Sequence, residues 1–141
     1  NEKYTDITVN TLKISVENYI NLLSEKGFDA EKNNYVTNSI RISASVNPEK
    51  MPGFNEGYFF VQDRASAISV AVLSPEENDM IIDVCSAPGG KSFSAAIYSS
   101  DKAKIESYDL HDSKLSLIRS GADRLGLKSV FVSQRDALAP K

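Results

Sequence analysis

Residues 81–91, Ile-Ile-Asp-Val-Cys-Ser-Ala-Pro-Gly-Gly-Lys, have the composition of a ligand-binding turn between a strand and a helix. A β-branched run ends near Asp83, a Pro-Gly-Gly turn follows, and a helical pattern begins at Lys91. Glycine removes side chains where a backbone must approach a ligand, and the first N–H groups of a helix are available to oxygen atoms. The segment therefore predicts a site for a carboxylate, a phosphate or a ribose.

Two common nucleotide-binding motifs match this turn only in part. Gly90-Lys91-Ser92 resembles the end of the phosphate-binding P-loop, but that motif requires a glycine where this sequence has Cys85. The dinucleotide-binding pattern G-x-G-x-x-G fails because the turn offers Gly89 and Gly90 alone. Neither motif is therefore favoured.

Three acidic residues stand in or just after successive predicted strands. Asp83 lies in the strand before the turn, Asp109 ends the next strand, and Asp136 follows the third. An acid at the end of the second strand can accept hydrogen bonds from ribose hydroxyls, and Asp136 could reach the edge of a base. Loop capping is the commoner role of an Asp after a strand. Three such acids beside this turn nevertheless favour an adenosine-containing ligand.

The elements that position these groups follow from the spacing of apolar residues. From residue 79 onward strands alternate with helices, in the order strand 80–85, helix 91–99, strand 104–108, helix 112–125 and strand 129–133. Repeated βα units indicate a parallel, doubly wound sheet that binds ligands at the carboxyl ends of its strands. Three strands are half of such a sheet, so we expect the chain to be a fragment.

The residues before this region predict a small α/β subdomain over 1–56, followed by a second domain over 57–141. The expected elements are strands 4–10, 35–44 and 58–62 and helices 16–26 and 64–73. Ser15 could cap the first helix, and Gly27 could stop it. A loop rich in Pro and Gly over 47–57 separates the two parts.

Composition indicates a soluble globular protein, with 41% apolar and 25% charged residues. No apolar run approaches the roughly 18–20 residues of a membrane span, and the start is no signal peptide. The single cysteine excludes an internal disulfide and fits a reducing cytoplasm. His111, the only histidine, has no Cys or His partners in its vicinity, so no metal site is expected.

The charge balance limits what this chain contributes to nucleic-acid binding. It has 16 basic and 19 acidic residues, a net charge of −3. Nucleic-acid binders usually carry a basic excess. If RNA binds, this chain alone does not supply the main electrostatic contact.

Two segments together resemble a known enzyme family. They are Gly57-Tyr-Phe-Phe-Val-Gln-Asp-Arg-Ala-Ser66 and Asp83-Val-Cys-Ser-Ala-Pro-Gly-Gly-Lys91, of which the second is highly specific. They resemble the RNA (cytosine-5) methyltransferases, most closely the type that acts on bacterial small-subunit ribosomal RNA. The likeness spans almost the whole chain, since Asn10-Thr-Leu-Lys13 and the helix after it resemble the small α/β, RRM-like RNA-binding subdomain. That subdomain precedes a Rossmann-like class I methyltransferase domain in the family.

The resemblance implies an S-adenosylmethionine site. It assigns a loop around the methionine part of the cofactor to Cys85, Ser86, Ala87, Pro88, Gly89, Gly90 and Lys91. It also places Asp109 at the ribose hydroxyls and Asp136 at the adenine amino group, and it leaves Asp83 a structural role.

The resemblance further implies a catalytic cysteine that these 141 residues do not contain. In the family a thiolate attacks C6 of cytosine, which makes C5 nucleophilic toward the methyl donor. That nucleophile lies in a Thr-Cys motif and a second cysteine in a Pro-Cys motif; Cys85 matches neither. We therefore expect an inactive fragment of a cytoplasmic enzyme that acts on RNA, able to self-associate through an exposed strand edge. The alternatives are a non-catalytic RNA-binding module of the same fold and a transfer-RNA cytosine-5 methyltransferase.

Overall fold

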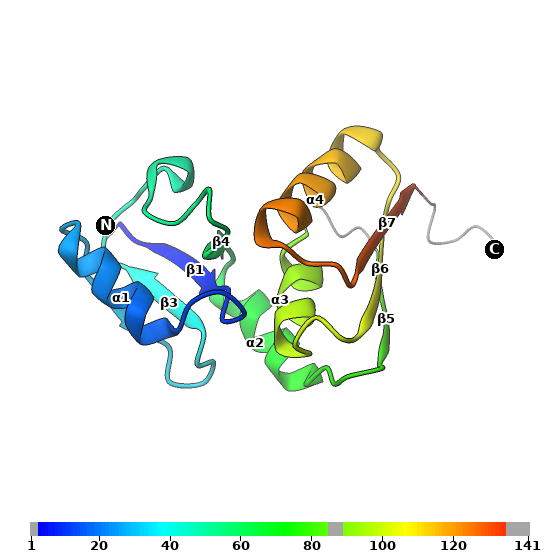
Figure 1. Cartoon of the computed structure of the whole chain (residues 1–141), viewed down its shortest axis with the longest axis horizontal. Helices are drawn as coiled ribbons and strands as arrows, with labels where there is room; N and C mark the ends of the chain where they lie inside the picture. The colour runs from blue at the N-terminus through cyan, green and yellow to red at the C-terminus, as the bar shows by residue number, and fades with distance from the viewer. Residues whose placement is uncertain (1–2, 85–88, 135–141) are drawn as a thin grey trace. The chain divides into compact units, whose positions relative to one another are not determined.

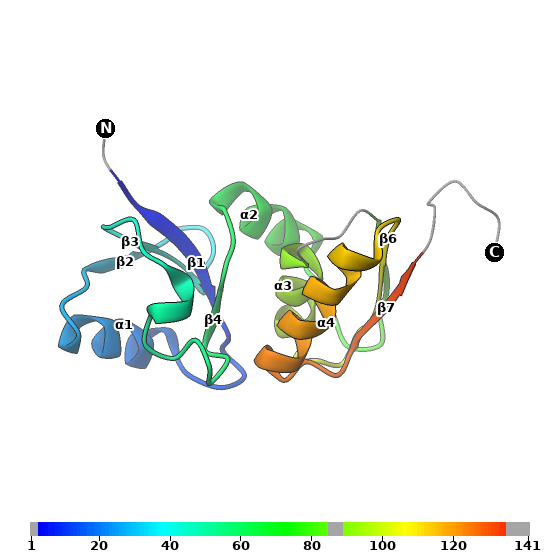
Figure 2. The same cartoon turned by 90° about the horizontal axis from the view of Figure 1, so that it is seen from above.

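The computed structural model describes residues 3–84 and 89–134 of the chain. Its internal contacts divide it into two compact units, Asn1–Ser69 and Val70–Lys141. Figure 1 shows the elements of each unit, and Figure 2 shows them from above. In the described residues, no helix combines the length and apolar character that crossing a membrane would require.

The N-terminal unit is an antiparallel sheet with one helix against it (Figure 1). Its sheet has the order β2-β3-β1-β4. The elements are β1 (Thr5–Val9), α1 (Val16–Glu25), β2 (Ala30–Lys32), β3 (Ser39–Ile42), the 3-10 helix η1 (Pro48–Lys50) and β4 (Phe59–Val61). The core joins inward-facing residues of the sheet to α1, with Ile7, Ile40, Tyr19 and Leu23 fully buried. Burial of this apolar surface is the main stabilising contribution of the unit.

The start of α1 and its buried face are as the sequence predicted. The Ser15 hydroxyl accepts a hydrogen bond from the Asn18 N–H at 3.1 Å, as an N-cap does. Tyr19 stacks on Phe59, with ring centroids 5.6 Å apart, and its hydroxyl donates to the Pro52 carbonyl at 2.8 Å. Burial raises the pKa of Tyr19 above its ordinary value. The aromatic residue Phe59 therefore belongs to the core.

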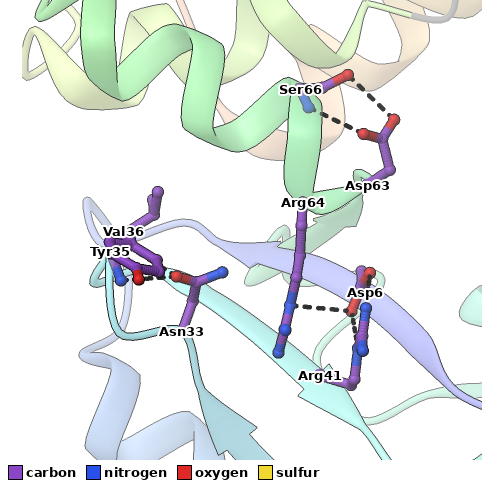
Figure 3. Close-up of polar contacts among 8 residues, drawn as sticks. All are labelled: Asp6, Asn33, Tyr35, Val36, Arg41, Asp63, Arg64 and Ser66. Atoms are coloured by element: carbon purple, nitrogen blue, oxygen red, sulfur yellow. Dashed lines mark hydrogen bonds and ion pairs between the residues drawn. The ribbon is translucent and has the colours of Figure 1, made fainter.

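The strand expected over 35–44 is shorter in the structure, and a strand that the sequence did not reveal lies before it. The Asn33 side chain accepts from the N–H groups of Tyr35 and Val36, at 2.7 and 3.2 Å, and holds that segment as a turn (Figure 3). β2 contains Ala, Glu and Lys, which have little strand preference. Its pairing with β3, in the register Ala30↔Ile42, makes it a strand.

The division between the units falls after Ser69, whereas the sequence suggested a boundary after residue 56. The difference comes from β4, which pairs with β1 in the register Val9↔Phe59. Next to β4, the Thr8 hydroxyl donates to the Gln62 side chain at 2.6 Å. These bonds tie the segment after the predicted loop to the N-terminal sheet.

Charged groups of the N-terminal unit also meet at β1 (Figure 3). Arg41 donates two hydrogen bonds to the Asp6 carboxylate, at 2.7 and 2.9 Å, and its guanidinium lies 3.7 Å from the centre of the Tyr4 ring.

Asp63 accepts from the N–H and the hydroxyl of Ser66, at 2.8 and 3.0 Å, which lowers the pKa of Asp63. Asp63 thereby caps α2 (Arg64–Leu73).

The second unit contains the parallel sheet that the strand–helix alternation predicted. Its elements are β5 (Met80–Val84), α3 (Gly90–Tyr98), β6 (Lys104–Asp109), α4 (Asp112–Leu125) and β7 (Val130–Gln134). The strand order is β5-β6-β7, and α3 and α4 lie on one side of the sheet (Figure 2). Their buried residues include Phe93, Leu115 and Ile118, and Ile105 of the central strand is fully buried. Met80, Ile82 and Phe131 are exposed.

Candidate functional site

The turn from β5 to α3 lies at the carboxyl end of the sheet. Gly89 has a φ of +105°, in the region that favours glycine, and α3 begins at Gly90. A Cβ atom built on Gly89 would lie 2.6 Å from Cζ of Phe93, a buried side chain of α3. The predicted residues Gly89, Gly90 and Lys91 therefore lie at the start of a helix, as expected. The predicted residues Cys85, Ser86, Ala87 and Pro88 lie outside the described residues.

Asp83 of β5 takes the place of a helix cap at this turn. Gly89, the N-cap residue, has no side chain to accept a hydrogen bond. The Ser92 hydroxyl donates to the Asp83 carboxylate at 2.7 Å, and the Ser92 N–H also forms a hydrogen bond with it. Burial raises the pKa of Asp83, opposed by the Ser92 bonds and the charge of Lys91. A carboxylate at a helix N-terminus is favourable, so this contact stabilises the start of α3.

Asp109 is the last residue of β6 and is 7% exposed. Its Oδ1 accepts from the His111 N–H at 3.1 Å, which is the loop-capping contact that the sequence left as an alternative. The register Val84↔Tyr108 brings the end of β5 beside the end of β6. The buried carboxylate of Asp109 and the carboxyl end of β5 therefore share one end of the sheet. A second role for Asp109, at a ribose, is compatible with this contact.

The end of β7 is tied to the same region. The Gln134 side chain donates to the Leu110 carbonyl at 2.7 Å, which joins β7 to the loop after β6. Asp136, the third predicted acid, lies outside the described residues. His111 is the N-cap residue of α4. In residues 3–84 and 89–134, no group of three or more His, Cys, Asp or Glu side chains is placed to hold a metal ion.

Two serines at this end of the sheet were not selected from the sequence. Ser92 and Ser107 are 1% and 0% exposed, and their hydroxyl oxygens lie 2.6 Å apart. Ser107 stands between Ile105 and Asp109 in a strand whose alternate residues are buried. A polar residue at such a position is the sequence signal that could have identified it.

The amino ends of the strands carry a different polar contact. Asp101 accepts from the N–H groups of Lys128 and Ser129, at 2.9 and 3.0 Å, and from the Ser129 hydroxyl. A cavity of 460 Å³ lies beside it, lined in part by Lys104 and Phe131. This end of the sheet is remote from the turn at Gly89 and holds the connections before β6 and β7 together.

Family models agree with this two-part organisation. A model described as 16S rRNA methyltransferase RsmB/F matches residues 70–141. The chain belongs to this family. A second model, the ferredoxin-like domain of RsmF/B-like methyltransferases, matches residues 3–49. The expected fold, a small α/β subdomain followed by a Rossmann-like methyltransferase sheet, is therefore confirmed.

Individual relatives support the same assignment. Ribosomal RNA small subunit methyltransferase B from Proteus mirabilis is 33% identical over 90% of this RsmB/F-family chain and 30% of its own length. The crystal structure of PH0851 is 32% identical with a TM-score of 0.92, over 97% of this chain and 31% of that one. The structure of NSun6 from Pyrococcus horikoshii with SFG has a TM-score of 0.88 over 96% of this chain and 59% of that one; at 20% identity the likeness concerns the fold. The chain spans about 30% of the length of the curated relative.

Proposed function

We propose that this chain binds S-adenosylmethionine at the carboxyl ends of β5 and β6. We further propose that the intact protein methylates C5 of a cytosine in small-subunit ribosomal RNA. The observation that carries the proposal is the pairing of a glycine turn at a helix N-terminus, where Gly89 has a φ of +105°, with the buried carboxylate of Asp109 on the adjacent strand. Membership of the RsmB/F family supports the same reaction class.

The residues present fit this cofactor in their chemistry. Asp109 supplies a carboxylate, the acceptor that ribose hydroxyls require. Gly89 and Gly90 let a ligand approach the backbone closely, and the first N–H groups of α3 favour oxygen atoms. In this proposal residues 85–91 surround the methionine part of the cofactor. Asp136 accepts a hydrogen bond from the adenine amino group. The cofactor supplies an electrophilic methyl group on its sulfonium.

The two parts of the chain have different roles in this proposal. The unit that begins at Val70 is the cofactor-binding domain, and the N-terminal unit, which includes β4, is a subdomain that contacts RNA. The net charge of −3 means that most of the attraction to RNA must come from elsewhere in the intact protein. Because Cys85, the only cysteine of these 141 residues, belongs to the cofactor turn, these residues alone should not transfer a methyl group.

The cofactor site is tested by calorimetric titration of the intact protein with S-adenosylmethionine. Asp109→Asn retains a carbonyl oxygen that can accept from the His111 N–H, so the loop keeps its cap. The variant loses a charge-assisted acceptor, and we expect cofactor affinity to fall by about 10-fold to 100-fold. The control is Asp112→Asn, an exposed acid in the first turn of α4, which should bind as the wild type does.

The reaction is tested by the transfer of labelled methyl groups to ribosomal and transfer RNA, followed by nucleoside analysis. We expect 5-methylcytosine in small-subunit ribosomal RNA. Absence of cofactor binding by the wild type, or equal affinities of the two variants, would contradict the proposed site. RNA binding without transfer would favour the non-catalytic module, and transfer to transfer RNA alone would favour the other alternative.

A further inference from the structure

A chain of three hydrogen-bonded polar groups, of which the two serines are buried, crosses the second unit beside the start of α3. It consists of Asp83 on β5, Ser92 on α3 and Ser107 on β6. The Ser92 hydroxyl oxygen lies 2.7 Å from Oδ2 of Asp83 and 2.6 Å from the Ser107 hydroxyl oxygen. Asp83 and Ser107 are directly opposite in the parallel register. The chain therefore joins two neighbouring strands and the helix between them.

The hydrogens of this chain have one arrangement when Asp83 is ionised. A carboxylate only accepts hydrogen bonds, whereas a serine hydroxyl donates one and can accept others. Ser92 must use its hydrogen for Asp83, so the 2.6 Å contact with Ser107 uses the hydrogen of Ser107. Both serines thus direct their donors toward the carboxylate. Ser107 acts on Asp83 only through Ser92.

We propose that Ser92 and Ser107 are positioning residues for cofactor binding, which hold the Asp83 carboxylate against the N-terminus of α3 and thereby fix the start of that helix at Gly89 and Gly90. The inference rests on the proposed cofactor site. It assigns a function to two residues that have no position in the turn itself. The physical reason is that Gly89 provides no cap, so the start of α3 depends on a carboxylate from another element.

The ionisation of Asp83 links this network to pH. Burial raises the pKa of Asp83, and the Ser92 hydrogen bonds and the Lys91 charge oppose that rise. Lys91 is on α3, and Asp109 lies two residues beyond Ser107 on the same side of β6. Loss of a hydrogen bond to the ionised form raises the pKa of a carboxyl further. When either serine is removed, the Asp83 carboxylate should therefore become protonated, and its contact with α3 weakened, at a higher pH than in the wild type.

The chain offers a matched control at the opposite end of the sheet. Ser129 is 7% exposed and its hydroxyl also donates to a carboxylate, that of Asp101. Ser129→Ala removes a serine–aspartate contact of the same kind, but one that holds the amino ends of the strands. If the serines of the network act only through stability, Ser107→Ala and Ser129→Ala should affect cofactor binding equally.

The experiment measures S-adenosylmethionine affinity of the intact protein by calorimetry, with the urea midpoint of each variant recorded. We expect Ser92→Ala and Ser107→Ala to weaken binding by about tenfold and Ser129→Ala to leave it unchanged. Ser107→Cys keeps the connectivity of the side chain with a slightly larger atom and a weaker donor, and it replaces Ser107→Ala in the experiment if that variant does not fold. Ser107→Cys should also weaken cofactor binding.

A second measurement records affinity as the pH is lowered from neutral toward the ordinary pKa of an Asp carboxyl, about 3.9, because a raised pKa decreases the ionised fraction within that range. Affinity should fall toward acid in the wild type, and the fall should begin at higher pH in Ser92→Ala and Ser107→Ala. Asp83→Asn should abolish the part of the pH dependence of affinity that comes from Asp83. Ser129→Ala should show the pH dependence of the wild type. Equal affinities of Ser107→Ala and Ser129→Ala, or superimposable pH profiles, would overturn the inference. A wild type that does not bind the cofactor would instead refute the proposed site.

Discussion

Replacing Gly89 by alanine tests the geometry of the turn most directly. Gly89 has a φ of +105°, and a left-handed conformation costs a non-glycine residue roughly 1–2 kcal/mol. The new Cβ atom would lie 2.6 Å from Cζ of Phe93. Phe93 is 4% exposed and cannot turn into solvent, so crowding adds about 1–3 kcal/mol. We expect Gly89→Ala to lower the free energy of unfolding by about 2–5 kcal/mol.

Gly121 is a matched control because it contacts the same ring. A Cβ atom on Gly121 would lie 2.5 Å from Cζ of Phe93, but Gly121 is inside α4 and has no positive φ. Gly121→Ala should therefore suffer the same crowding without the backbone strain, and it gains about 1 kcal/mol of helix propensity. Its net destabilisation should be about 0–2 kcal/mol.

The assay is urea unfolding of the intact protein, with each substitution made in the wild type and in a Phe93→Leu background. The smaller side chain relieves the crowding, so Gly121→Ala should become neutral or stabilising there. Gly89→Ala should keep its backbone strain of about 1–2 kcal/mol in that background. Equal effects of the two glycine substitutions in both backgrounds, or a Gly89→Ala protein as stable as the wild type, would refute this reasoning.

Two further predictions concern the second unit. Burial raises the pKa of Asp83 because the cost of desolvating the carboxylate outweighs the stabilisation that Ser92 and Lys91 give it. The folded state therefore holds the proton more tightly than the unfolded state, and ionisation of Asp83 lowers the free energy of unfolding as pH rises above the unfolded pKa of about 3.9. The free energy of unfolding of Asp83→Asn should therefore increase relative to that of the wild type as the pH rises. Urea titrations at several pH values measure this difference, and a difference that does not change with pH would contradict the prediction. Leu115→Ala, at a fully buried position of α4, should cost about 2–5 kcal/mol, whereas Leu117→Ala, at a position 56% exposed, should change stability by less than about 0.5 kcal/mol in thermal unfolding. Similar losses for both leucines would mean that the buried face of α4 is misassigned.

Features that depend on neighbours in sequence were predicted well. The strand–helix alternation after residue 79 indicated all three parallel strands and both helices between them. Ser15 caps α1 as predicted, and Gly27, predicted to stop that helix, follows its last residues with a positive φ. Apolar periodicity and caps act within a few residues, so their signals are present in the local sequence.

Features that depend on partners distant in sequence were missed. β2 has a composition with little strand preference, and its pairing with β3 alone makes it a strand. The residues around β4 belong with the N-terminal sheet because β4 pairs with β1, about 50 residues earlier in the chain. No local pattern reveals such a partner.

The candidate site divides in the same way. The sequence by itself determined that a glycine turn joins a strand to a helix and that Asp109 ends the next strand, because both follow from the order of residue types. Only the tertiary structure decided that Asp83 caps α3 through Ser92 and that Ser107 supports that contact. These bonds join residues 9 and 15 positions apart, so they exist only once the parallel register has placed β5 beside β6 and α3 has packed over both.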